Sequence, residues 1–182
     1  MRKLLLEGLI RSPLTEGPPL PTDAALAELA AAVERKSRHR LGRSLSIREV
    51  DAGSCNGCEL EIHALNNVLY DLERFGLRFV ASPRHADVLL VTGPVTTNMR
   101  EALLRTYNAT PAPKWVVAAG DCAANCGVFA GSYAVEGGVS SVVPVDLHIR
   151  GCPPSPLELL RGLLALLEDA TYSAGAGARG GA

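Results

Sequence analysis

The chain has 182 residues, 47% of them hydrophobic and only 4% aromatic, and its 18 basic and 19 acidic side chains give a net charge of −1. The length suits one domain with modest extensions, and the balanced charge argues against nucleic acid as the main partner. No apolar run approaches the roughly 20 residues of a membrane span, and the first residues do not have the pattern of a signal peptide.

Residues 1–43 are predicted to form an arm followed by a helix. Prolines and glycines interrupt residues 12–21, and Thr22-Asp23 is a suitable cap for a helix over 24–40. Basic residues gather at the end of this helix, which suits its dipole. We interpret them as a solvated helix end, and the alternative is a docking patch for an acidic partner or a membrane surface. These basic residues are Arg35, Lys36, Arg38, Arg40 and Arg43.

From residue 44 strands alternate with helices, and residues 44–170 are predicted to form the main domain. This β-α-β pattern predicts an open parallel sheet with helices on both faces. A tail at 171–182, almost all glycine and alanine, is predicted to be disordered. The predicted strands cover 45–50, 77–82, 86–93, 114–120 and 142–151, and the predicted helices cover 59–76, 98–108 and 156–169.

Four of the five cysteines follow predicted strands. Cys55 and Cys58 come after the first strand, Cys122 after the fourth and Cys152 after the fifth. Because ligands in such sheets bind beyond the carboxyl ends of the strands, these loops are expected to open on one edge. A cubane iron–sulfur cluster takes four cysteines and fits this glycine-rich pattern best. Gly57 is expected to permit the turn between the first two thiols.

Three other uses of these cysteines remain open. A structural zinc site usually pairs two C-x-x-C knuckles, whereas this chain has only Cys55 and Cys58 at that spacing. A thioredoxin-type redox pair would explain those two cysteines and leave Cys122 and Cys152 without a role. Disulfides are disfavoured because five cysteines without an export signal point to metal or redox use.

Several neighbours of these cysteines have two interpretations. Cys126 is a small buried thiol or a spare ligand, and its side chain would face the same way as Cys122 if that segment is helical. Glu59 lies one turn from His63 and is either a proton relay beside the cluster or a carboxylate that stabilises the helix start. Glu61 is expected to be solvated. Asp121 either caps its loop or places charge next to a ligand.

At these residues the chain resembles the iron–sulfur small subunit of membrane-bound, energy-converting nickel–iron hydrogenases of the formate hydrogenlyase type. The same family includes the B (20 kDa) subunit of NADH–quinone oxidoreductase. The resemblance covers about two thirds of the chain, from Ile47 to Leu167. Quinone-reducing relatives usually carry adjacent cysteines at the first ligand position, so C-N-G-C resembles the hydrogenase branch. Asp121 and Cys126 depart from the common pattern. The matching stretches are GSCNGCELEI, ERFGLRFVASPRHADVLLVTGPVT, GDCAANCGVFAGSYAV and VDLHIRGCPPSP.

The resemblance implies a flavodoxin-like fold and one 4Fe–4S cluster held by Cys55, Cys58, Cys122 and Cys152. It implies an electron-transfer subunit of an oxidoreductase, not catalytic alone, whose partners are a large catalytic subunit, other iron–sulfur subunits and membrane subunits. Its expected place is peripheral, on the cytoplasmic side of the cell membrane. The alternatives are the cluster subunit of an NADH–quinone oxidoreductase and a zinc-stabilised scaffold.

Overall fold

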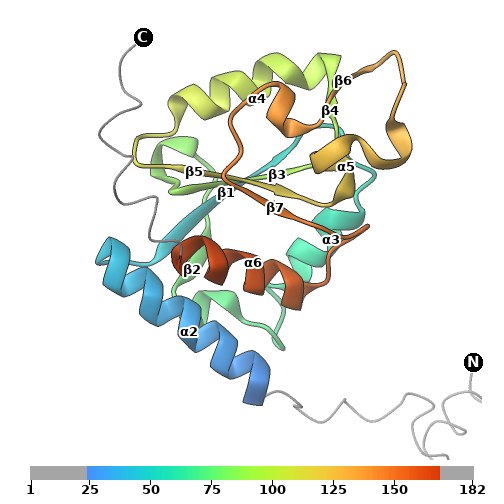
Figure 1. The fold of residues 1–182 in the computed structure, drawn as a ribbon. Coiled ribbons are helices and arrows are strands. Elements are labelled where there is room, and N and C mark those ends of the chain that lie inside the picture. The colour runs from blue at the N-terminus through green and yellow to red at the C-terminus, as the bar shows by residue number, and fades with distance from the viewer. Residues whose placement is uncertain (1–23, 169–182) are drawn as a thin grey trace, which may run out of the picture.

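The computed structural model describes residues 24–168 as an α/β fold with five parallel strands in the order β2-β1-β3-β5-β7. Helices lie on both faces of the sheet, as Figure 1 shows. This is the strand order of flavodoxin-like sheets, so the predicted fold class is confirmed. The predicted arm before residue 24, its Thr22-Asp23 cap and the tail at 171–182 lie outside the described residues.

The elements alternate along the chain as expected for a doubly wound sheet. The sheet strands are β1 (Leu45–Asp51), β2 (Leu77–Phe79), β3 (Val88–Thr92), β5 (Trp115–Ala119) and β7 (Leu147–Ile149). The helices are α2 (Ala24–Leu41), α3 (Gly57–Ala64), α4 (Thr97–Ala109), α5 (Asp121–Asn125) and α6 (Pro156–Glu168). Strands β4 (Val95–Thr96) and β6 (Val135–Gly137) form a small antiparallel pair. The short 3-10 segments are η1 (Leu72–Phe75), η2 (Pro83–His85), η3 (Gly127–Phe129) and η4 (Val139–Ser141).

Strand β3 is the centre of the sheet. All of its residues are buried, and it pairs with β1 on one side and β5 on the other. The last residues of four strands are aligned across the sheet: Asp51 pairs with Thr92, Thr92 with Ala119, and Ala119 with Ile149. The four loops that follow these strands therefore start at the same level.

Alternation along the strands divides the apolar side chains into two cores. Leu45 and Ile47 of β1 face the layer of α6 and α2, whereas Val50 and Ala52 face α4. Figure 1 shows α6 and α2 on one side of the sheet and α4 on the other. Helix α6 contributes five fully or nearly buried leucines to the first core, and α2 packs largely against α6. These leucines are Leu159, Leu160, Leu163, Leu166 and Leu167.

The single helix predicted over 59–76 is wrong. Helix α3 ends at Ala64, and η1 begins only after a turn. In that turn the Asn67 side-chain oxygen accepts hydrogen bonds from the backbone N–H groups of Leu69 and Tyr70, at 2.8 and 3.0 Å. A side chain that satisfies these N–H groups competes with helix formation, so the helical periodicity is overridden there.

The last strand is shorter than the predicted range 142–151. Pro144 has no N–H to donate to a ladder. Asp146 then bonds to the neighbouring strand with both its backbone and its side chain: its N–H donates to the Val116 carbonyl at 2.9 Å, and its carboxylate accepts from the Val116 N–H at 2.8 Å. Strand β7 starts only after this contact.

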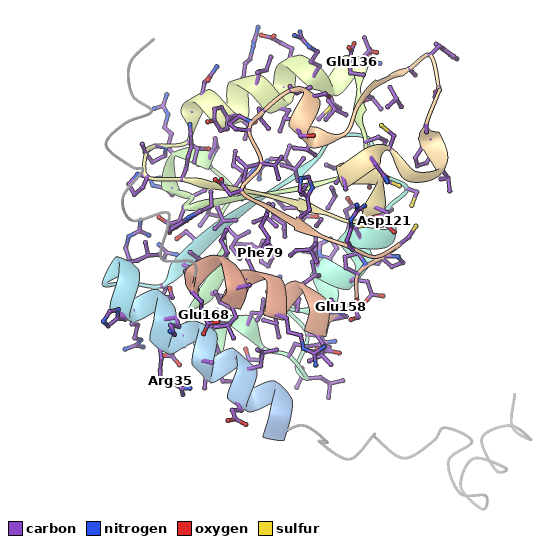
Figure 2. All side chains as sticks on the ribbon, in the orientation of Figure 1. Arg35, Phe79, Asp121, Glu136, Glu158 and Glu168 are labelled. Atoms are coloured by element: carbon purple, nitrogen blue, oxygen red, sulfur yellow. The ribbon has the colours of Figure 1, made fainter. Side chains whose placement is uncertain are left out.

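Most of the basic side chains at the end of α2 have local partners or face solvent. Lys36 lies 3.7 Å from Glu168, and Arg38 lies 2.8 Å from Glu34 one turn earlier. Figure 2 labels Arg35 on the outer side of α2. Surface pairs of this kind contribute little to stability.

Arg43 makes a different contact, which fixes the start of the sheet. Its guanidinium donates two hydrogen bonds to Asp87, one of them at 2.9 Å from Nη1 to Oδ2. Asp87 is only 4% exposed and also accepts the Ser46 N–H at 2.9 Å. A buried carboxylate is tolerated only when its oxygens are paired, so this contact ties the start of β1 to the residue before β3.

We predict that Asp87→Asn lowers the free energy of unfolding by roughly 1–3 kcal/mol, because the amide cannot accept all the hydrogen bonds that the buried carboxylate accepts. Chemical denaturation measures the change. Glu101→Gln is the control, since Glu101 pairs with Arg105 on the exposed face of α4 and its loss should cost less than about 1 kcal/mol. Equal effects of the two substitutions would contradict this account of Asp87.

Candidate metal centre

The four cysteines predicted as ligands line one cavity at the carboxyl edge of the sheet. The cavity has a volume of about 80 Å³. Its walls come from the loops after β1, β3, β5 and β7, which start at the same level of the sheet. Figure 2 labels Asp121 at this edge, where α3 and α5 begin. The lining residues are Ser54, Cys55, Gly57, Cys58, Gly93, Asp121, Cys122, Gly151, Cys152 and Pro153.

Short side chains build the turn that carries the first two cysteines. The Asp51 carboxylate accepts the N–H groups of Gly53 and Ser54 at 2.8 and 2.7 Å. The Ser54 hydroxyl then accepts the Asn56 N–H at 3.0 Å. Asn56 has a left-handed conformation with φ 70°, which asparagine tolerates better than most residues. The left-handed residue of the turn is thus Asn56. The sequence had suggested that Gly57 permits this turn.

Two glycines leave room for cysteine sulfurs. A Cβ atom at Gly120 would lie 2.6 Å from Cys58 Sγ, and one at Gly127 would lie 2.8 Å from Cys122 Sγ. At Gly57 the nearest atom, Cys55 Sγ, would be 3.6 Å away, an ordinary contact. The spacing of the sequence identifies these glycines as flanking residues, but only the fold shows that Gly120 lies against a cysteine 62 positions earlier.

The loops of the last two cysteine sites are joined by Asp121. Its backbone N–H donates to the Gly151 carbonyl at 2.8 Å, and its carboxylate accepts the Gly151 N–H at 3.3 Å. Arg150 lies 3.5 Å from the same carboxylate oxygen. These contacts give Asp121 the loop-capping role that was one of its two interpretations, and they place Cys122 and Cys152 beside each other.

Burial raises the pKa of two thiols of this cavity, Cys58 and Cys122. Burial, followed by the charge of Glu59, raises the pKa of Cys58 to about 12. Burial and then Cys152 raise the pKa of Cys122, against a backbone hydrogen bond from Val128 that lowers it. A cation in the cavity would reverse the balance, because metal binding deprotonates cysteine.

Cys126 stands apart from the other cysteines. Helix α5 ends at Asn125, and Cys126 takes a left-handed conformation with φ 70° directly after it. It is not among the residues that line the cavity. Cys126 and Cys122 thus do not share a helix face, and Cys126 is half-buried and not fully buried.

Glu59 is an unusual carboxylate for its position. It is 7% exposed, and neither of its carboxylate oxygens has a hydrogen-bond partner among the described residues. Glu61 is half-buried and His63 is exposed, so Glu59 and His63 do not share an environment. Glu49 of β1 faces this group, and its pKa is raised by burial and then by the charge of Glu59.

The four thiols of the cavity could hold an iron–sulfur cluster by their donor chemistry. No group of three or more His, Cys, Asp or Glu side chains within 24–168 is placed to hold one metal ion. Zinc needs all its sulfurs about 2.3 Å from one point. In a cluster each cysteine binds its own iron, so the thiols stand farther apart. The four thiols and the space left by Gly120 and Gly127 have the donor chemistry that such a cluster requires.

Comparison with known proteins identifies relatives. Residues 55–166 match the family described as NADH ubiquinone oxidoreductase, 20 kDa subunit. The chain is 43% identical over 162 residues to formate hydrogenlyase subunit 7 of Escherichia coli, which covers 87% of this chain and 62% of that protein. It is 46% identical over 128 residues to a probable membrane-bound hydrogenase subunit of Pyrococcus furiosus, which covers 70% and 77%. The chain thus spans less than two thirds of formate hydrogenlyase subunit 7.

A solved structure is also similar. The fold matches a chain of the membrane-bound sulfane sulfur reductase, an archaeal respiratory membrane complex, with a TM-score of 0.63 and 33% sequence identity. The match covers 80% of this chain and 77% of that one.

We predict that Gly120→Ala removes most of the iron from the anaerobically purified chain, because the new methyl group would displace Cys58 Sγ. Gly131→Ala is a matched control. Both glycines have positive φ, 93° and 81°, but a Cβ at Gly131 meets nothing within 4 Å. Both variants should lose roughly 1–3 kcal/mol from backbone strain, since Gly120, with φ 93° and ψ 157°, has a conformation nearly restricted to glycine. Equal iron loss in the two would show that strain, and not the contact with Cys58, is responsible.

Proposed function

Since the chain belongs to the family of the 20 kDa subunit of NADH–ubiquinone oxidoreductase, we propose that it is the electron-transfer subunit of a membrane-bound oxidoreductase complex. The observation that carries this proposal is the meeting of four thiols from three separate loops around one cavity. The relatives named in the comparisons belong to formate hydrogenlyase, a membrane-bound hydrogenase and a sulfane sulfur reductase. All of these are oxidoreductases.

The cofactor in this proposal is one 4Fe–4S cluster held by Cys55, Cys58, Cys122 and Cys152. Such a cluster supplies one-electron transfer. The chain's own residues give the cavity its shape: Gly120 lets Cys58 approach, and Asp121 holds the last two cysteine loops together. Hydrogen bonds from backbone N–H groups to the cluster sulfurs would tune the reduction potential.

A large catalytic subunit is the proposed partner. Cys55 and Cys152 are exposed in the isolated chain, and an exposed cluster would be open to water and oxygen. Apolar side chains stand out near the same edge: Leu60 is 61% exposed and Val128 is 83% exposed. A partner that covers this edge would bury them. The reaction centre would lie in that partner, and further iron–sulfur subunits would exchange electrons with the cluster.

Membrane subunits are proposed to hold the complex at the membrane. Within residues 24–168 no helix is both long and apolar enough to cross a bilayer. The membrane-bound complexes of the relatives support a peripheral place for this chain, which we assign to the cytoplasmic side.

The hydrogenase branch is favoured over the quinone-reducing branch by two observations. The first is C-N-G-C in place of adjacent cysteines, and the second is the similarity to formate hydrogenlyase subunit 7. The quinone-reducing complex is the second candidate. A partner large subunit with two C-x-x-C pairs would support the hydrogenase, and a partner without them would support the quinone-reducing complex. A zinc scaffold is the third candidate, and visible absorption of the anaerobic protein distinguishes it from both.

We predict that serine at any of the four ligand positions, Cys55, Cys58, Cys122 or Cys152, removes or converts the cluster, because the hydroxyl is a harder and poorer iron ligand than thiolate. Cys126→Ser is the matched control and should keep iron and sulfide near the wild-type content. The measurement is iron and sulfide analysis of the five anaerobic variants. The ligand set proposed here is wrong if Cys126→Ser loses iron while Cys122→Ser retains it.

Glu59 is proposed to relay protons beside the cluster. Glu59→Gln should then slow turnover of the assembled complex by roughly 10²- to 10⁴-fold with unchanged iron content, because the amide cannot exchange a proton at neutral pH. Glu61→Gln, two residues along the same helix, is the control and should leave turnover near the wild-type rate. Turnover of Glu59→Gln within about twofold of wild type would be too small a loss for proton transfer and would leave Glu59 a structural role only.

A further inference from the structure

A second cavity lies at the opposite edge of the sheet from the cysteines. It has a volume of about 250 Å³ and is lined by Arg43, Arg78, Arg84, His85, Ala86 and Pro111. These residues come from the segment before β1, from β2, from η2 before β3 and from the segment before β5. Four stretches of chain thus bring three guanidinium groups and one imidazole to a single hollow. We call it the arginine pocket.

The arginine pocket carries positive charge that its own residues do not neutralise. No acidic side chain is among its lining residues. Asp87, next to the lining residue Ala86, is buried, and its oxygens already accept hydrogen bonds from Arg43 and from the Ser46 N–H. Asp87 therefore compensates Arg43, and within residues 24–168 no ion pair joins Arg78 or Arg84 to a carboxylate.

Some N–H groups of the pocket's side chains donate no hydrogen bond to residues 24–168. Arg78 donates from Nε to Ser46 Oγ at 3.1 Å, which fixes its stem and leaves its two terminal nitrogens unused. Within residues 24–168 the side chains of Arg84 and His85 form no hydrogen bond or ion pair. Like charges held around one hollow repel each other unless an anion lies between them. Planar guanidinium groups suit phosphate oxygens, which accept two of their N–H groups at once.

The pocket is independent of the cysteine cavity. It lies at the amino ends of the parallel strands, whereas the cysteines follow the carboxyl ends. Strand β3, which separates the two edges, has five residues, and a strand of that length spans roughly 16 Å. A ligand in the arginine pocket would therefore not contact the cysteines. The function of the pocket must be separate from metal binding by the cysteines.

From this geometry we infer that the arginine pocket binds a phosphate group. Phosphate has the charge that the pocket lacks and the oxygen arrangement that two guanidinium groups recognise. The group can belong to a free phosphate anion or to the headgroup of an anionic lipid, and the recognition chemistry is the same for both. A lipid headgroup would give this peripheral chain a direct contact with the membrane, at the opposite edge of the sheet from the cysteines.

Calorimetric titration of the full chain with inorganic phosphate, compared with chloride at equal ionic strength, tests the inference. We expect phosphate to bind and chloride not to bind. The double variant Arg78→Gln/Arg84→Gln should weaken phosphate binding roughly tenfold or more, because it removes charge-assisted hydrogen bonds. Arg84→Gln alone tests the same site without touching the contact to Ser46. Arg43 is left in place because it pairs with buried Asp87.

The control is Arg100→Gln/Arg161→Gln, which removes the same net charge from exposed positions on α4 and α6. Its affinity for phosphate should stay within about twofold of wild type, as expected for distant surface charges in salt. Phosphate binding no stronger than chloride binding would overturn the inference. Equal weakening in the control and in the pocket variants would overturn it too, since it would reflect net charge only.

Vesicles distinguish the two sources of phosphate. Phosphatidylcholine vesicles with and without phosphatidate are sedimented with the wild-type chain and with Arg78→Gln/Arg84→Gln. Sedimentation that requires both phosphatidate and the two arginines assigns the pocket to a lipid headgroup. Binding of inorganic phosphate without such sedimentation assigns it to a free anion.

Discussion

The alignment of four strand ends is the constraint on which the cysteine site depends. Hydrogen bonds across the parallel sheet hold Asp51, Thr92, Ala119 and Ile149 in one row. Each of these strands is followed directly by a segment that contributes residues to the cavity. Because one shift in register would carry a whole loop away from the others, the buried valines and leucines of the sheet decide where the thiols meet.

Burial at this edge has an energetic consequence for the cofactor. Burial and then the charge of Glu59 raise the pKa of Cys58 to about 12, and burial also raises the pKa of Cys122. Binding of a cluster must release their protons and supply positive charge. Affinity for the cluster should therefore depend on pH. Asp121 joins two of the loops through Gly151.

Much of this arrangement could be predicted from the sequence. The open parallel sheet and the convergence of Cys55, Cys58, Cys122 and Cys152 follow from the β-α-β pattern, because the loops after parallel strands open on one edge. The flavodoxin-like strand order was implied only by the family resemblance. The break in the helix after Ala64 could not be predicted. It depends on one side chain, Asn67, whose hydrogen bonds to the backbone compete with a helix that the periodic pattern favours. The sequence also does not predict contacts between residues far apart in the chain, such as those of Gly120 with Cys58 and of Arg43 with Asp87. The arginine pocket is a further case, because its arginines are scattered along the chain and only the fold brings them together.

The packing of α2 against α6 bears on the order in which the protein can assemble during synthesis. Helix α2 is made before any strand of the sheet, yet its main neighbour, α6 (Pro156–Glu168), is made after the last one. Until α6 is made, η1 covers only part of the apolar side of α2, and exposed apolar surface of this kind favours aggregation. Cys152 precedes α6 by only a few residues. Closure of this core and completion of the set of four thiols around the cavity therefore depend on neighbouring segments that are synthesised at nearly the same time.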